Sequence, residues 1–180
     1  MTKYTKIAFI AEYGDCNLIW NYNIITHVTV EDHIVSVYAN ETLFSKFSIT
    51  QNPKNGQWAR HGKYKLYRPT GEYKSRTSYF NVGKLHREDG PAECLKFKKG
   101  AKTFAYYING KRHREDGPAY VEICSDGHIS KEIYYINGKR HREDGPAQVI
   151  TYRVVGKTLT SWYYHGEIYE PLLTKKALNI

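Results

Sequence analysis

The chain has 180 residues, of which 41% are hydrophobic and 14% aromatic, and its formal net charge is +9. This length fits one domain with a continuous core, and the apolar fraction excludes an intrinsically disordered chain. No apolar run approaches the about 20 residues of a membrane-spanning helix, and the N-terminus lacks the layout of a secretion signal, so we expect a soluble, cytosolic protein without a membrane partner.

Short β-strands are expected along the first 50 residues, because apolar and polar side chains alternate there between turn residues. From Thr26 to Val30 the alternation has the period of two that is typical of a strand with one wet face. Residues 1–51 contain no repeat motif, so they form either a β cap on the rest of the chain or a small β subdomain of their own. The strands expected here cover residues 6–11, 18–25, 27–30, 34–38 and 43–49.

One heptapeptide, His-Arg-Glu-Asp-Gly-Pro-Ala, occurs three times, at residues 86–92, 113–119 and 141–147. The copies are 27 and 28 residues apart, and the longer unit of residues 107–119 is identical to residues 135–147. A period of this length is typical of stacked repeats, in which each unit buries its apolar face against its neighbours.

Three turns shape each unit, and the third of them is Ser125-Asp126-Gly127. Asn109-Gly110 and Asn137-Gly138 predict two-residue hairpins of type I′, which need a positive φ at both positions. In Asp-Gly-Pro we expect a second bend, where glycine adopts a positive φ, proline interrupts the ladder, and aspartate bonds to backbone amides. The residues assigned to these structural turns are Asp89, Gly90, Asp116, Gly117, Asp144, Gly145, Gly110 and Gly138.

Weaker copies flank the three complete ones. In a decayed first copy residues 58–62 replace the heptapeptide, and residues 162–166 begin a truncated last copy. We therefore predict a mainly β protein with an elongated antiparallel sheet of β-hairpin repeats, about five units over residues 52–169, and a β cap before it. Residues 170–180 are expected to form a short C-terminal helix that closes the open end of the sheet.

The phrase Tyr-x-x-Asn-Gly-Lys-x-His-Arg-x-Asp-Gly-Pro-Ala resembles the variant MORN-type repeats, and more closely the repeats of proteins from large tailed bacteriophages and giant viruses. The resemblance covers about residues 55–169. It implies an elongated, MORN-like stack of β-hairpins with a binding role, and a phage-encoded factor that acts on a host component in the host cytoplasm. It brings no catalytic residues. The lipid-binding roles suggested for MORN-type repeats do not follow, because the glycine after the hairpin lies within the heptapeptide here.

Three histidines at equivalent positions, His86, His113 and His141, raise the question of a metal site. If each repeat adds two strands about 4.8 Å apart, equivalent side chains lie about 10 Å apart, whereas a metal–nitrogen bond is only about 2.0–2.1 Å long. We therefore expect no metal and no cofactor. No Ser or Cys nucleophile recurs beside the copies, and three near-identical sites would be unusual in an enzyme, so we expect no enzymatic activity.

Two explanations remain open for the repeated arginines Arg87, Arg114 and Arg142. In the first, each guanidinium is structural and pairs with the Asp of its own copy or with a Glu of a neighbouring repeat. In the second, the arginines and the three histidines together form a repeated binding row.

A basic segment precedes the first complete copy. Between residues 54 and 84 there are eight lysines and arginines and one acid, interleaved with aromatic residues. Exposed aromatic side chains among cations can hold single-stranded nucleic acid, although strand alternation alone gives the same pattern when the aromatic residues face inward. The binding candidates in this segment are Trp58, Arg60, Lys63, Lys65 and Arg68.

The leading interpretation is a non-enzymatic binding protein whose extended repeat face engages a protein partner, such as a host defence protein if the chain is phage-encoded. Tyr, Trp and Arg are effective interface anchors, and the chain is rich in them. The alternative is nucleic-acid or nucleotide binding through residues 54–84 and the repeated arginines.

Overall fold

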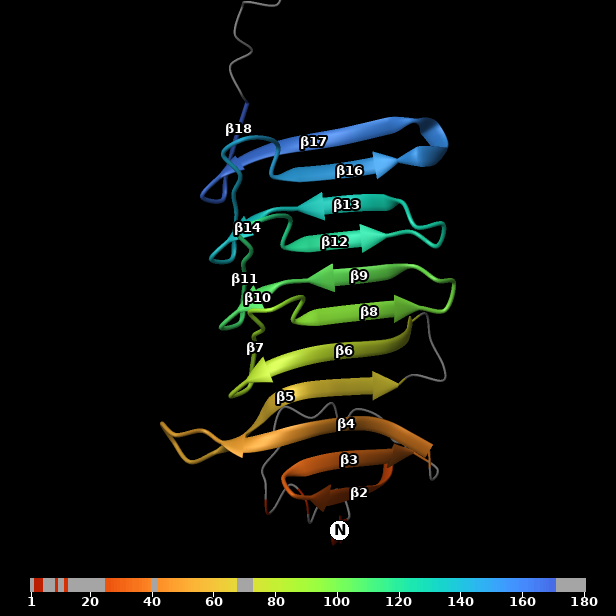
Figure 1. Ribbon diagram of the computed structural model, residues 1–180, viewed down its shortest axis with the longest axis vertical. Coiled ribbons are helices and arrows are strands. Elements are labelled where there is room, and N and C mark those ends of the chain that lie inside the picture. Colours follow the sequence, from red (N-terminus) through yellow and green to blue (C-terminus); the bar gives the residue numbers. More distant parts are fainter. Residues whose placement is uncertain are drawn as a thin grey trace, which may run out of the picture.

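A single antiparallel sheet organises the molecule. The computed structural model describes residues 2–4, 9, 12, 25–39, 42–67 and 73–170. Within these residues fourteen strands form one open sheet, whose strands pair in chain order as sequential hairpins. Figure 1 shows them stacked from β2 to β17 along the long axis of an elongated ribbon. The mainly β, antiparallel hairpin architecture predicted from the sequence is confirmed.

The strands of the large sheet follow the order of the chain. They are β1 (Thr2–Tyr4), β2 (Ile25–Glu31), β3 (Ile34–Ala39), β4 (Thr42–Gln51), β5 (Trp58–Tyr67), β6 (Tyr73–Asn81), β7 (Lys84–Leu85), β8 (Glu93–Phe97), β9 (Lys102–Ala105), β12 (Tyr120–Ile123), β13 (Ile129–Ile133), β16 (Gln148–Tyr152), β17 (Lys157–Tyr164) and β18 (Glu167–Tyr169).

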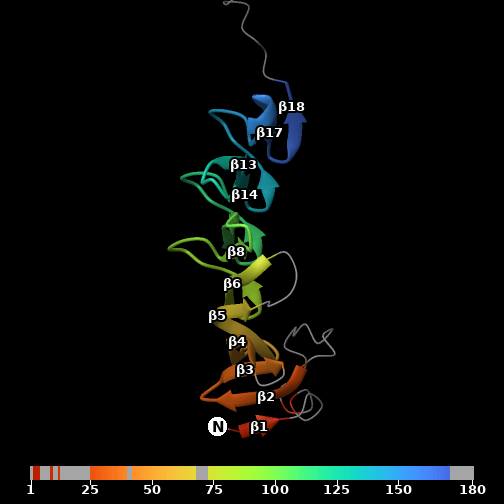
Figure 2. The same cartoon turned by 90° about the vertical axis from the view of Figure 1, so that its right-hand side faces the viewer.

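Each repeat adds two strands to this sheet and carries a small hairpin beside it. The hairpins β10 (Tyr107–Ile108) with β11 (Lys111–Arg112) and β14 (Tyr135–Ile136) with β15 (Lys139–Arg140) are separate two-stranded sheets. They line up along one side of the ribbon together with β7 and β18 (Figures 1 and 2). The sequence predicted the hairpins but not their departure from the main sheet.

The hairpin turns have the predicted backbone conformation. Asn109 and Gly110 have φ angles of 51° and 83°, and Asn137 and Gly138 have 51° and 86°. The same pair of positive angles occurs in the weaker copies, where Val82-Gly83 and His165-Gly166 occupy the turn. Type I′ geometry is therefore common to all four hairpins, including those without asparagine.

The N-terminal strands belong to the same sheet, because β4 pairs with β5. The strands predicted at 27–30, 34–38 and 43–49 are confirmed by β2, β3 and β4. The strand predicted at 6–11 is wrong at Phe9, which is helical and fully buried. Most of the one predicted at 18–25 lies outside the described residues.

The largest apolar core lies at the N-terminal end of the ribbon. It contains Phe9, Phe47 and Leu66, each at most 1% exposed, together with valines from β2 and β3. In the three complete repeats the buried apolar side chains are smaller and periodic. They are the last residue of each heptapeptide and two strand residues, namely Ala92, Ala119, Ala147, Ala105 and Ile133.

The first unit of the repeat region differs from the sequence prediction in one respect. β5 continues from Trp58 to Tyr67 through an irregularity next to Gly62, whose φ is 66°. Residues 58–61 pair with β4 as part of this strand, so residues 58–62 do not form a counterpart of the heptapeptide turn. Instead the carbonyl of Arg60 accepts a 2.8 Å hydrogen bond from the N–H of Gly83, as the carbonyl of Leu85 does from Gly110. The C-terminal helix predicted at residues 170–180 lies, apart from Glu170, outside the described part of the chain.

Candidate functional site

The three heptapeptides connect the small hairpins to the strands of the main sheet. Each begins after β7, β11 or β15 and leads into β8, β12 or β16. The final alanine of every copy is completely buried, and its carbonyl accepts a hydrogen bond of 2.7 or 2.8 Å from a tyrosine N–H. The polar part of each copy is thereby held in one position at the side of the ribbon.

The guanidinium group of each heptapeptide is bound on two sides. Its Nε donates to Oδ1 of the Asp two residues later, over 2.6 Å for Arg87, 2.8 Å for Arg114 and 2.7 Å for Arg142. Its Cζ also lies 4.1 Å from the centre of a tyrosine ring of the same repeat, in cation–π contact. These rings belong to Tyr79, Tyr106 and Tyr134. The predicted pairing of arginine with the Asp of its own copy is confirmed.

These ion pairs shift the titration of their members. The hydrogen bond from arginine is the main cause that lowers the pKa of Asp89, Asp116 and Asp144 below the ordinary value. The same bond is the main cause that raises the pKa of Arg87 and Arg142. The aspartates are exposed, so solvent screens the pairs.

The Asp-Gly-Pro glycines have a different role from the predicted one. None of Gly90, Gly117 and Gly145 has a positive φ, so the left-handed conformation expected for them is wrong. A Cβ at these positions would lie 3.3, 3.2 and 2.9 Å from the Cζ of the arginine three residues earlier. Glycine leaves room for the guanidinium at these positions, and a larger residue would have to displace it.

The histidines join consecutive repeats. Nδ1 of His86 accepts a 3.1 Å hydrogen bond from the N–H of Asn109 in the next hairpin, and Nδ1 of His113 accepts one of the same length from Asn137. Nδ1 of His141 accepts a 3.2 Å bond from the N–H of His165. An accepting Nδ1 places the proton of the neutral ring on Nε2, which lies 3.6 Å from the Glu of the same copy.

Two equivalent grooves lie between successive copies of the heptapeptide. The first has a volume of about 530 Å³ and the second about 570 Å³. Each is lined by two arginines, four carboxylates, one histidine, one tyrosine, one isoleucine and one glycine, which gives a formal charge of −2 with neutral histidine. The first groove contains Arg87, Glu88, Asp89, Gly90, Tyr106, Ile108, His113, Arg114, Glu115 and Asp116. The second contains Arg114, Glu115, Asp116, Gly117, Tyr134, Ile136, His141, Arg142, Glu143 and Asp144.

The grooves present carboxylates rather than free guanidinium groups. The side chains of Glu88, Glu115 and Glu143 are 82%, 84% and 77% exposed, whereas those of the three heptapeptide arginines are only 25–27% exposed. A row of this charge disfavours a phosphate ligand, because like charges repel.

A second set of arginines, which the sequence analysis did not select, lies immediately before the histidines. Arg112 donates through Nε to the hydroxyl of Tyr107 over 3.1 Å and through Nη1 to that of Tyr135 in the next repeat over 3.4 Å. Arg140 donates to the hydroxyl of Tyr163 over 2.9 Å. The identity of residues 107–119 and 135–147 was the available signal, since it repeats both arginine and tyrosine.

The binding candidates of the basic segment lie in two different places, some against the core and others at a surface pocket. Trp58 is half-buried against the core, and the guanidinium of Arg60 lies 4.4 Å from the ring centre of Phe80. Lys63 and Lys65 instead line a pocket with Lys46 of β4. Arg68 lies outside the described residues.

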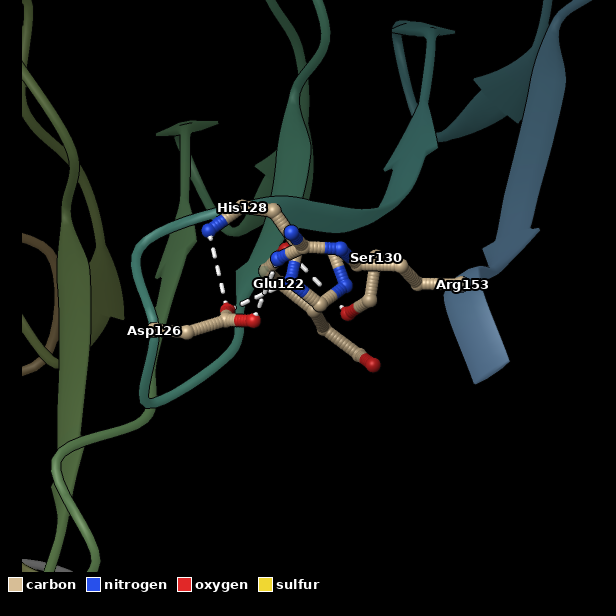
Figure 3. Close-up of polar contacts among 5 residues, drawn as sticks. All are labelled: Glu122, Asp126, His128, Ser130 and Arg153. Carbon is tan, nitrogen blue, oxygen red and sulfur yellow. Dashed lines mark hydrogen bonds and ion pairs between the residues drawn. The ribbon is translucent and has the colours of Figure 1, made fainter. Parts of the chain in front are cut away.

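A polar cluster joins the turn between β12 and β13 to the turn between β16 and β17 (Figure 3). Both turns lie at the strand ends that are farthest from the heptapeptides. Asp126 lies between β12 and β13, where its Oδ1 is 2.5 Å from Nδ1 of His128, and its Oδ2 accepts a 2.7 Å bond from Nη1 of Arg153. The hydrogen bond with His128 is the main cause that lowers the pKa of Asp126. Ser130 donates to the carbonyl of Glu122, so it does not complete a Ser-His-Asp arrangement.

The described residues contain neither a metal-binding group of side chains nor a membrane-spanning helix. No three His, Cys, Asp or Glu side chains of that part could hold a metal ion together. None of its helices is long and apolar enough to cross a membrane.

A comparison of the chain with protein-family models finds no match, and a comparison with curated proteins finds none either.

Proposed function

We propose that this chain is a non-enzymatic binding protein whose extended repeat face engages a protein partner. The observation that carries this proposal is the recurrence of one groove at the spacing of the repeats. Histidine hydrogen bonds between consecutive repeats hold the two grooves in register. A surface that is rigid and periodic suits an extended ligand more than a small molecule, which would need one closed pocket.

The chemistry of the grooves indicates which kind of partner segment would bind in them. Each groove has an isoleucine and a tyrosine in its lining and a formal charge of −2. An extended polypeptide with basic side chains complements this surface, because opposite charges speed encounter and fix register. The resemblance of the repeats to bacteriophage proteins makes a host protein, including a defence protein, the first partner to test.

The test is a charge reversal along the row. The variant E88K/E115K/E143K changes three exposed glutamates, whereas K54E/K99E/K157E changes three exposed lysines outside the grooves. Affinity capture from a bacterial host lysate identifies the partner, and calorimetry with the purified partner measures the affinity. We expect the glutamate variant to bind at least tenfold more weakly and the lysine variant to bind like the wild type. Equal binding by both folded variants would contradict the assignment of the grooves.

A further inference from the structure

A separate pocket of about 290 Å³ lies on strands β3, β4 and β5 and shares no residue with the two grooves. Its polar lining consists of Ser48 and three lysines, Lys46, Lys63 and Lys65. The alternating residues Phe47, Tyr64 and Leu66 are buried in the core. Successive side chains of a strand point to opposite faces, so the lysines project from the other face of the sheet.

The three lysines concentrate positive charge without a described counter-ion. Lys46 and Lys65 are direct cross-strand partners in the pairing of β4 with β5. Side chains at such positions are about 4.5–5.5 Å apart at Cβ, and like charges there are destabilising. The pocket lining contains no carboxylate, and none of the carboxylates within the described ranges forms an ion pair with these lysines. A bound anion would remove this repulsion.

The same pocket has an apolar side. Ile34 and Tyr67 line it, and both are 38% exposed. Among the described side chains before residue 100, these two are the large hydrophobic ones that reach this exposure. An exposed aromatic ring next to cations offers a surface on which a planar base can stack.

We propose that this pocket binds a nucleotide unit, with its phosphate between the ammonium groups of Lys46, Lys63 and Lys65 and its base against Tyr67 and Ile34. The unit is either a free nucleotide or one nucleotide of a single strand, because both offer a phosphate next to an accessible base. A duplex offers its phosphates but keeps its bases stacked inside. This site is independent of the protein-binding grooves and goes beyond the function proposed for them.

The experiment uses the full chain and four probes: ATP, inorganic phosphate, a labelled single-stranded oligonucleotide of twelve residues, and the corresponding duplex. Calorimetry measures the two small probes, and fluorescence anisotropy measures the two oligonucleotides. The test variants are K46Q/K65Q and Y67A. K54Q/K99Q is the matched control, because it removes the same charge from exposed positions outside the pocket.

We expect ATP or the single strand to bind the wild type, and K46Q/K65Q and Y67A to bind at least about tenfold more weakly. The control should bind like the wild type, and K46Q/K65Q should be at least as stable as the wild type because a like-charged pair is removed. Tighter binding of ATP identifies the free nucleotide as the ligand, and tighter binding of the oligonucleotide identifies the single strand.

Three results would overturn the proposal. They are the absence of binding by ATP and the single strand, an equal loss of affinity in both double-lysine variants, and affinity that does not depend on Tyr67. An equal loss in both double-lysine variants would show that a chain with net charge +9 attracts phosphate groups without a specific site. The E88K/E115K/E143K variant of the grooves should bind the nucleotide no more weakly than the wild type does. Each of the two proposals can therefore fail without the other.

Discussion

The backbone N–H of Asn137 donates a 3.1 Å hydrogen bond to Nδ1 of His113, 24 residues earlier in the preceding repeat. Two backbone bonds accompany it, from Gly138 N–H to the carbonyl of Arg112 and from Arg114 N–H to the carbonyl of Tyr135. Three backbone N–H groups therefore attach this hairpin to its predecessor. Of these three bonds, only the one to His113 can be removed by a side-chain substitution.

Replacing His113 with alanine should lower the free energy of unfolding by about 1–2 kcal/mol, because the N–H of Asn137 loses its acceptor. H113N should restore part of the loss, since an amide oxygen can accept the same bond. Urea denaturation followed by circular dichroism measures both. His61 is exposed and outside the complete copies, so H61A should change stability by no more than about 0.5 kcal/mol. Equal losses for H113A and H61A would refute the role of the histidine.

Alanine at Gly145 should be more destabilising than alanine at Gly117. The added Cβ would lie 2.9 Å from Cζ of Arg142 in the first case and 3.2 Å from Cζ of Arg114 in the second. Overpacking of this kind costs about 1–3 kcal/mol. In a double-mutant cycle, G145A should cost less in an R142A background, because the guanidinium that it displaces is gone. Strictly additive effects would show that the arginine is not the obstacle.

Asparagine at position 82 should stabilise the first hairpin. Val82 has a φ of 42°, a conformation that is strained for a β-branched residue by about 1–3 kcal/mol. Asparagine tolerates this region, so V82N should raise the free energy of unfolding by about 1 kcal/mol. The reciprocal change N109V, at the equivalent turn position, should lower it by a similar amount. Thermal and urea denaturation of the two variants check the opposite signs.

Acid should destabilise the protein through the heptapeptide aspartates. Their folded pKa lies below the ordinary value of 3.8, so the unfolded chain binds more protons as the pH falls. The stabilisation is present above about pH 4 and is lost as the pH drops through the lowered pKa. The urea midpoint should therefore fall between pH 5.5 and pH 2.5. The D89N/D116N/D144N variant should show a smaller fall, and an unchanged fall would place the effect elsewhere.

Local sequence was sufficient for the turns and the repeat period. Asn109-Gly110 specifies a type I′ turn because both residues tolerate a positive φ, whatever the rest of the chain does. The strand order could also be predicted from the sequence, since sequential hairpins leave each strand beside its neighbours in the chain. The arginine–aspartate pairs were predictable because their partners are two residues apart.

The functions of individual side chains required the tertiary structure. Gly117 was assigned a backbone role, but its actual neighbour is a guanidinium whose position depends on stacking against Tyr106. The hydrogen bond that Nδ1 of His113 accepts from the next repeat depends on the register between repeats, which the residues around His113 do not specify.

The sequence by itself determined that the chain is a stack of β-hairpin units with a fixed turn in each, because turn conformation and period depend on residues close together in the chain. Only the tertiary structure decided which charged side chains remain exposed to a ligand. The pairing of β4 with β5 brings Lys46 beside Lys65. The packing of each repeat leaves the heptapeptide arginines only 25–27% exposed and the glutamates next to them mostly exposed. Such juxtapositions depend on strand register, which the pattern of one strand alone does not specify.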